Sequence, residues 1–145
     1  MANMEYMFGG SGAFNSDISN WDVSKVTSMR YMFKDATSFN ADISNWDVSR
    51  VRNMYRMFSD AESFNCDISN WDVSRVTYMQ HMFCRATSFN QALCEAPWVQ
   101  STAVKDGMFF GSPGSISTAL CTASRAVFSP QSKDCLLYTS PSPRD

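Results

Sequence analysis

The chain has 145 residues, and its 12 Lys and Arg against 14 Asp and Glu give a formal net charge of −2. This balance excludes the basic excess that nucleic-acid and anionic-membrane partners favour, and no apolar run approaches the about 20 residues of a membrane-spanning helix. No nucleophile, phosphate-loop or metal-ligand motif occurs, so we expect a non-enzyme without cofactor, metal site, nucleic-acid partner or membrane span.

An eight-residue string recurs along the chain without a single change. It reads Asp-Ile-Ser-Asn-Trp-Asp-Val-Ser and begins at Asp17, Asp42 and Asp67, which are spaced by 25 residues. A fixed period of this size is typical of a solenoid, in which each repeat buries its apolar face against its neighbours. Residues 1–94 therefore contain four 25-residue repeats, of which the fourth is partial.

The first repeat starts with the chain itself. Met1 occupies the position that Val26, Val51 and Val76 hold in the later repeats. No basic segment followed by an apolar run precedes it, so this sequence shows no signal peptide. The simplest hypothesis is that the chain is a fragment and Met1 an internal methionine, in which case the missing signal peptide carries no information on localisation.

Each repeat contains two kinds of apolar spacing. Val51, Met54, Met57, Phe58 and Ala61 follow i, i+3, i+6, i+7, i+10, which predicts a short helix near residues 53–60. Residues 71 and 73 are two apart, which predicts a strand near residues 70–74. We therefore predict an α/β, leucine-rich-repeat-like solenoid with one short strand and one short helix per repeat and with parallel, stacked strands.

Equivalent apolar positions form lanes along the repeats, and we expect these lanes to build the core. The principal members are Met4, Met29, Met54, Met79, Phe8, Phe33, Phe58, Phe83, Trp21, Trp46 and Trp71.

The polar neighbours of the inward Trp and Val side chains are expected to point outward and to form a candidate binding face on the concave strand surface. Its members are Asn20, Asp22, Ser24, Asn45, Asp47, Ser49, Asn70, Asp72 and Ser74. Stacked carboxylates repel one another. Compensation could come from the basic lane of Lys25, Arg50 and Arg75, from hydrogen bonds to turn amides, or from a Ca²⁺ ladder. A second Asp lane (Asp17, Asp42 and Asp67) indicates a turn or capping role.

Two adjacent positions change from repeat to repeat. They hold Glu5-Tyr6, Arg30-Tyr31, Tyr55-Arg56 and Gln80-His81. Surface drift explains such variation, and a surface that reads a partner through Tyr and Arg anchors is the alternative.

The repeat resembles that of a known family of surface proteins. The string is Val-Thr-x-Met-x-x-Met-Phe-x-x-Ala-x-x-Phe-Asn-x-x-Ile-Ser-x-Trp-x-Val-Ser, and it resembles the repeats of BspA-like leucine-rich-repeat proteins, including mycoplasmal surface lipoproteins, over residues 1 to about 110. The resemblance implies an extracellular or cell-surface location and a role in protein or glycan interaction or adhesion. The alternative is a structural repeat of an extracellular coat or envelope without a specific ligand.

The C-terminal part departs from the repeat. Residues 95–112, with Trp98 two positions late, resemble the degenerate capping repeat of that family, and residues 113–134 are expected to be a Ser/Thr/Ala-rich linker. Residues 135–145 resemble the translation of a sequencing-library adapter. Cys94 and Cys121 are the candidate cap disulfide, which would fit an oxidising compartment. Cys66 and Cys84 stand at variable positions, so we expect free thiols there.

Overall fold

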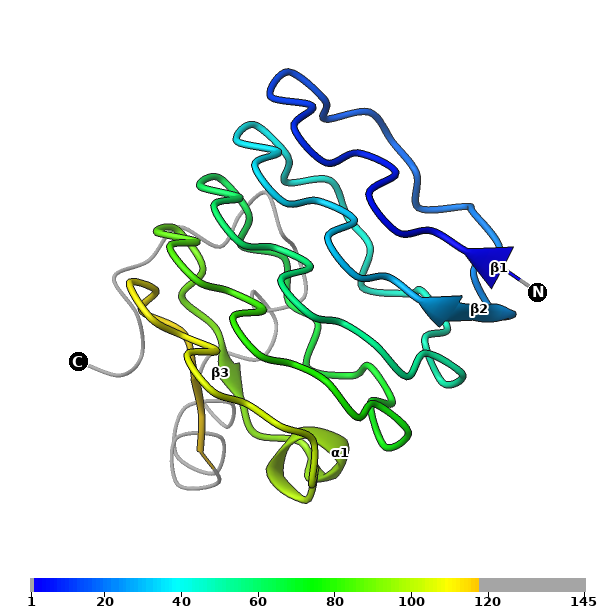
Figure 1. Ribbon diagram of the computed structural model, residues 1–145, viewed down its shortest axis with the longest axis vertical. Coiled ribbons are helices and arrows are strands. Elements are labelled where there is room, and N and C mark those ends of the chain that lie inside the picture. Colours follow the sequence, from blue (N-terminus) through cyan, green and yellow to red (C-terminus); the bar gives the residue numbers. More distant parts are fainter. Residues whose placement is uncertain (1, 118–145) are drawn as a thin grey trace.

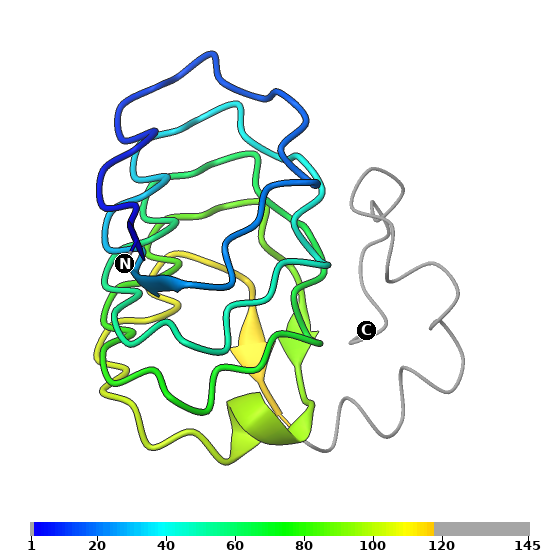
Figure 2. The same cartoon turned by 90° about the vertical axis from the view of Figure 1, so that its right-hand side faces the viewer.

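The computed structural model describes residues 2–117 as a stack of similar coils. Figures 1 and 2 show the coils following one another along the stack from the N-terminal end. We name them coil 1 (residues 2–25), coil 2 (26–50), coil 3 (51–75), coil 4 (76–100) and coil 5 (101–117).

Parallel pairing connects the coils on one side of the stack. Strand β1 (Ala2–Asn3) pairs with β2 (Val26–Ser28), and isolated parallel bridges continue the column from Ser28 to Asn53, Tyr78 and Val104. Between coils 4 and 5, β3 (Ala92–Leu93) also pairs in parallel with β4 (Ser115–Ile116). The helix α1 (Ala96–Val99) forms a single turn in coil 4.

The pairing column does not lie where the sequence placed the strand. Residues 71 and 73 are buried as expected, but residues 70–74 form turns and irregular extended chain. Their backbone bonds are local, because the Trp71 N–H donates to the Ile68 carbonyl and the Val76 N–H donates to the Val73 carbonyl. The prediction that residues 71 and 73 point inward is confirmed, whereas the predicted strand at this position is wrong.

The predicted helix at residues 53–60 is also wrong, since this segment forms consecutive turns. The N–H groups of Met57, Ser59 and Ala61 donate three residues back within coil 3. The N–H groups of Arg56, Phe58 and Asp60 instead donate to carbonyls of coil 4. Arg56 and Asp60 have φ values of 52° and 60°, and left-handed residues cannot continue a right-handed helix. The leucine-rich-repeat class itself remains a prediction.

The core consists of columns of identical side chains. Ring centroids in the Phe33, Phe58 and Phe83 column are 5.5 Å apart, and within coil 2 Phe33 stacks on Phe39 at 4.0 Å. The predicted core residues of coils 2 to 4 are all buried: Met29, Met54, Met79, Phe33, Phe58, Phe83, Trp46 and Trp71. In coil 1, Met4 and Phe8 are partly buried and Trp21 is 39% exposed, because this coil has a neighbour on one side only.

The tryptophan column connects each coil to the one before it. Each indole N–H donates to the Ile carbonyl of the preceding coil, with distances of 3.1 Å from Trp46 to Ile18 and 3.1 Å from Trp71 to Ile43. Trp98 continues the column with a bond of 3.2 Å to Ile68, although it comes two residues late in the sequence. The single turn of α1 accommodates this insertion.

The C-terminal part of the stack differs from two expectations. The stack continues beyond residue 112, since β4 lies inside the stretch predicted to be a linker. Cys66 and Cys94 are both disulfide-bonded, so the prediction of a free thiol at Cys66 is wrong, while Cys84 is free and buried. Cys121, the remainder of the predicted linker (118–134) and the adapter-like segment (135–145) lie outside the described residues. Within residues 2–117, no helix has the length and apolarity needed to span a membrane.

Candidate functional site

The predicted polar face is exposed, but its carboxylates are occupied by local turns. The side chains of Asn20, Asn45 and Asn70 are exposed. Those of the Asp lane on this face, Asp22, Asp47 and Asp72, are exposed as well. Asp47 Oδ1 accepts a bond of 3.0 Å from the Ser49 N–H and one of 2.6 Å from the Ser49 hydroxyl. Asp22 makes the same two bonds with Ser24, and the Asp72 carboxylate accepts from the Ser74 N–H. These residues therefore lie in a series of turns and not on a concave strand surface.

Hydrogen bonding is the main compensation for the stacked carboxylates. The pKa of Asp47 is lowered first by the Ser49 hydroxyl and next by the Ser49 N–H, with a smaller contribution from Arg50. The neighbouring Asp22 opposes this shift and raises the pKa of Asp47. No salt bridge within residues 2–117 joins the basic lane to the Asp lane. The basic lane, one of the expected sources of compensation, thus contributes less to the Asp47 carboxylate than the hydrogen bonds within the turn.

The second Asp lane has the turn role that its sequence pattern indicates. Asp17 Oδ1 accepts bonds of 3.0 Å and 2.7 Å from the N–H and hydroxyl of Ser19, and Asp42 does the same with Ser44. Within the described part of the chain, no group of three His, Cys, Asp or Glu side chains is arranged to hold a metal ion.

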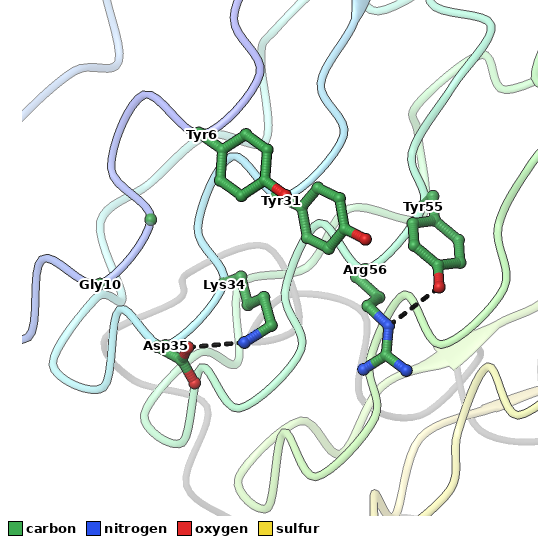
Figure 3. Close-up of a pocket in the computed structure, with 8 residues that line it drawn as sticks. Tyr6, Gly10, Tyr31, Lys34, Asp35, Tyr55 and Arg56 are labelled. Atoms are coloured by element: carbon green, nitrogen blue, oxygen red, sulfur yellow. Dashed lines mark hydrogen bonds and ion pairs between the residues drawn. The ribbon is translucent and has the colours of Figure 1, made fainter.

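An open groove crosses the variable positions of coils 1 to 3 and has a volume of about 630 Å³. We call it the tyrosine groove. Its lining residues are Tyr6, Gly9, Gly10, Tyr31, Lys34, Asp35, Tyr55 and Arg56. Figure 3 shows the three tyrosines in a row, each from a different coil.

Aromatic contacts hold this row in place. Tyr6 stacks on Tyr31 with ring centroids 4.5 Å apart, and Tyr31 meets Tyr55 edge-on at 5.3 Å. His81 extends the row into coil 4, with its ring 6.4 Å from that of Tyr55. Pairs of this geometry contribute about 0.5–1.5 kcal/mol beyond their buried area, so these contacts stabilise the row.

The left-handed backbone places these side chains. Tyr6, Tyr31, Arg56 and His81 occupy the same position of successive coils and have φ values of 60°, 62°, 52° and 56°. In coil 3 the order of the variable pair is reversed, Tyr before Arg, so Tyr55 approaches its neighbour by its edge.

One cation in the groove has no carboxylate partner. Lys34 bonds to Asp35 at 2.7 Å, whereas none of the salt bridges within residues 2–117 involves Arg56. Arg56 Nε instead donates to the Tyr55 hydroxyl at 3.2 Å, and the guanidinium lies 5.6 Å from the centroid of that ring. This bond lowers the pKa of Tyr55 and raises that of Arg56. Lys34 and Arg56 against Asp35 leave a net positive charge among the lining residues.

Sequence reasoning identified the variable pairs but not the groove they form. Gly9, Gly10, Lys34 and Asp35 complete the lining, and none of them was a candidate. Gly9 and Lys34 occupy the same position of successive repeats, and the residue at this position varies. This variation was the signal that could have added the position to the candidate partner-binding surface.

These observations define a class: a repeat protein of stacked 25-residue coils, with Asp turns on its surface and an aromatic groove across three coils. The chain belongs to the family described as "Mycoplasma protein of unknown function, DUF285", whose sequence model matches residues 2–119. No curated protein and no solved structure matches the chain.

Proposed function

We propose that this chain is a non-catalytic interaction module of a surface or secreted protein of the BspA-like leucine-rich-repeat type, binding a protein or glycan ligand. The observation that supports this function is the tyrosine groove, which collects the positions where the repeats differ. Tyr and Arg are among the residues enriched at binding hot spots. An extracellular or cell-surface location is part of the proposal, and the disulfide-bonded Cys66 and Cys94 fit an oxidising compartment.

The competing function is a structural repeat of an extracellular coat without a specific ligand. It is favoured by the identity of the string at Asp17, Asp42 and Asp67, because its aspartates accept hydrogen bonds within turns and its Ile and Val side chains are buried. The two functions differ in one respect that can be measured, which is reproducible binding to a defined partner.

An array of proteins and glycans probed with the full chain distinguishes them. The double variant Tyr6→Ala/Tyr31→Ala removes two of the three tyrosine rings that line the groove. The matched double variant Asn45→Ala/Asn70→Ala alters the exposed polar face that the sequence suggested. Hits that disappear only with the tyrosine variant are the expected result. Hits that disappear only with the asparagine variant would move the site to the polar face, and an array without hits would favour the structural repeat.

A further inference from the structure

We infer that the tyrosine groove binds an acidic saccharide chain, one whose sugar units carry carboxylate groups. This inference rests on the proposed function and specifies the ligand class of the same site. It follows from three properties of the lining residues. Their backbone N–H groups are already hydrogen-bonded, their side chains include aromatic rings with hydroxyl groups, and their net charge is positive.

The backbone of the groove has no N–H groups to offer a peptide. The N–H groups of Tyr6, Tyr31 and Arg56 donate to carbonyls of the next coil. Those of the other lining residues are equally used: Gly9 to Tyr6, Gly10 to Lys34, Lys34 to Tyr31, Asp35 to Ser59, and Tyr55 to the Asn53 side chain. A peptide that adds as a strand needs main-chain partners, so this mode of recognition is closed here.

The lining also lacks the apolar pocket that a peptide anchor requires. It contains tyrosine, glycine, lysine, aspartate and arginine, and no aliphatic side chain. Tyr6 is 56% exposed, and one face of its ring stacks on Tyr31. Exposed rings that carry hydroxyl groups suit a sugar, whose C–H groups pack against aromatic carbon atoms while its own hydroxyls make hydrogen bonds.

The spacing of the row suits a chain of such units. Neighbouring tyrosine rings lie 4.5 Å and 5.3 Å apart, which is comparable to the step between successive pyranose rings of an extended saccharide. One saccharide chain running along the stack could therefore contact three coils in succession.

Arg56 supplies the preference for an acidic ligand. Among residues 2–117 its guanidinium has no carboxylate partner, while its bond to Tyr55 holds it beside the row of rings. A planar guanidinium held in place favours a carboxylate, which it binds with two parallel bonds.

Calorimetric titration of the full chain with a galacturonic acid oligomer tests the inference. The matched ligand is the same oligomer after reduction of its carboxyl groups, and polyglutamate serves as an acidic peptide. We expect the galacturonic acid oligomer to bind at least about tenfold more tightly than either of the other two. Arg56→Gln should abolish the difference between the two saccharides, whereas Arg75→Gln, the same change of charge at an exposed turn outside the groove, should leave it unaltered.

Each other result overturns a defined part of the inference. Equal binding of the reduced oligomer would exclude the charge preference, and tighter binding of polyglutamate would exclude the saccharide; both would leave the proposed function intact. A chain that binds none of the three probes but has array hits sensitive to Tyr6→Ala/Tyr31→Ala refutes the ligand class alone. A chain with no hits in either experiment refutes the proposed function as well.

Discussion

Single tryptophan side chains connect the coils, and their importance depends on the neighbour each one finds. Trp71 is buried and its indole N–H reaches the Ile43 carbonyl of the preceding coil. Trp21, at the same position of coil 1, is 39% exposed and has no acceptor within the described residues. The same residue type in the same sequence context thus contributes differently to stability.

This difference gives a prediction about two matched substitutions. Trp71→Phe removes buried volume and a buried donor, so we expect it to lower the free energy of unfolding by about 2 kcal/mol. Trp21→Phe should lower it by less than about 1 kcal/mol, since the side chain is partly exposed. Urea denaturation followed by circular dichroism measures both, and equal losses would contradict the assigned role of the inter-coil bond.

At the scale of the element, each coil is shaped by left-handed residues four positions apart. Asp35, Asp60 and Arg85 have φ values of 63°, 60° and 56°. Each of them lies four residues after another left-handed residue of the same coil. In coil 5 the two positions are Gly107 and Gly111, with φ values of 64° and 74°. Glycine adopts this conformation without a steric cost, so coil 5 avoids strain that the other coils carry.

Gly107 is the more demanding of these glycines. A Cβ atom there would lie 2.5 Å from the His81 ring, whereas a Cβ atom on Gly10, with a φ of 77°, would meet nothing within 4 Å. We expect Gly107→Ala to cost about 1–3 kcal/mol of unfolding free energy, and Gly10→Ala about 1 kcal/mol from backbone conformation alone. Repeating Gly107→Ala in a His81→Ala background should recover the difference, because the crowded ring is gone. An unchanged cost in that background would show that the ring moves away freely.

The same turns explain which parts of the fold the sequence could predict. The period and the core lanes were predictable, because apolar side chains that stack on their own copies must recur at the repeat length. The helix was not, since a run of tight turns three residues apart places Met54, Met57 and Phe58 on one side just as a helix does. The left-handed positions gave little signal, because Tyr, Asp, Arg and His occupy seven of the ten that lie within residues 2–117, and glycine only three.

At the scale of the whole molecule, the groove exists only because three coils lie in register. The variable pairs could be identified from the sequence. A single repeat, however, does not show that these pairs line a groove, or that Gly10 and Lys34 line it with them. The sequence also could not predict that Lys34 and Arg30 find carboxylates at Asp35 and Glu5, while Arg56 finds none among residues 2–117. Pairing of charges between neighbours is a property of the assembled stack.

The carboxylates distributed over the stack make its stability depend on pH. The pKa values of Asp22, Asp47 and Asp72 are lowered mainly by their hydrogen bonds to the serine two residues ahead, and that of Asp60 mainly by Arg85. A group whose pKa is lower in the folded state contributes stability above its unfolded pKa and loses it as pH falls through the folded value. With an unfolded Asp pKa of about 3.9, the melting temperature should be constant from pH 7 to about 5 and fall steeply below about 4.

The double variant Asp47→Asn/Asp72→Asn isolates the contribution of the turn lane. An amide oxygen can accept the same N–H bonds, but it carries no charge and does not titrate, so it imitates the protonated carboxyl group. We therefore expect the variant to melt below the natural chain at pH 7 and by a smaller margin at about pH 3, because part of the stability that the charged carboxylates contribute is lost once the pH is below the unfolded Asp pKa of about 3.9. Scanning calorimetry at both pH values measures the two gaps. A gap of the same size at both would show that these aspartates act through their shape alone and that acid instability arises elsewhere in the stack.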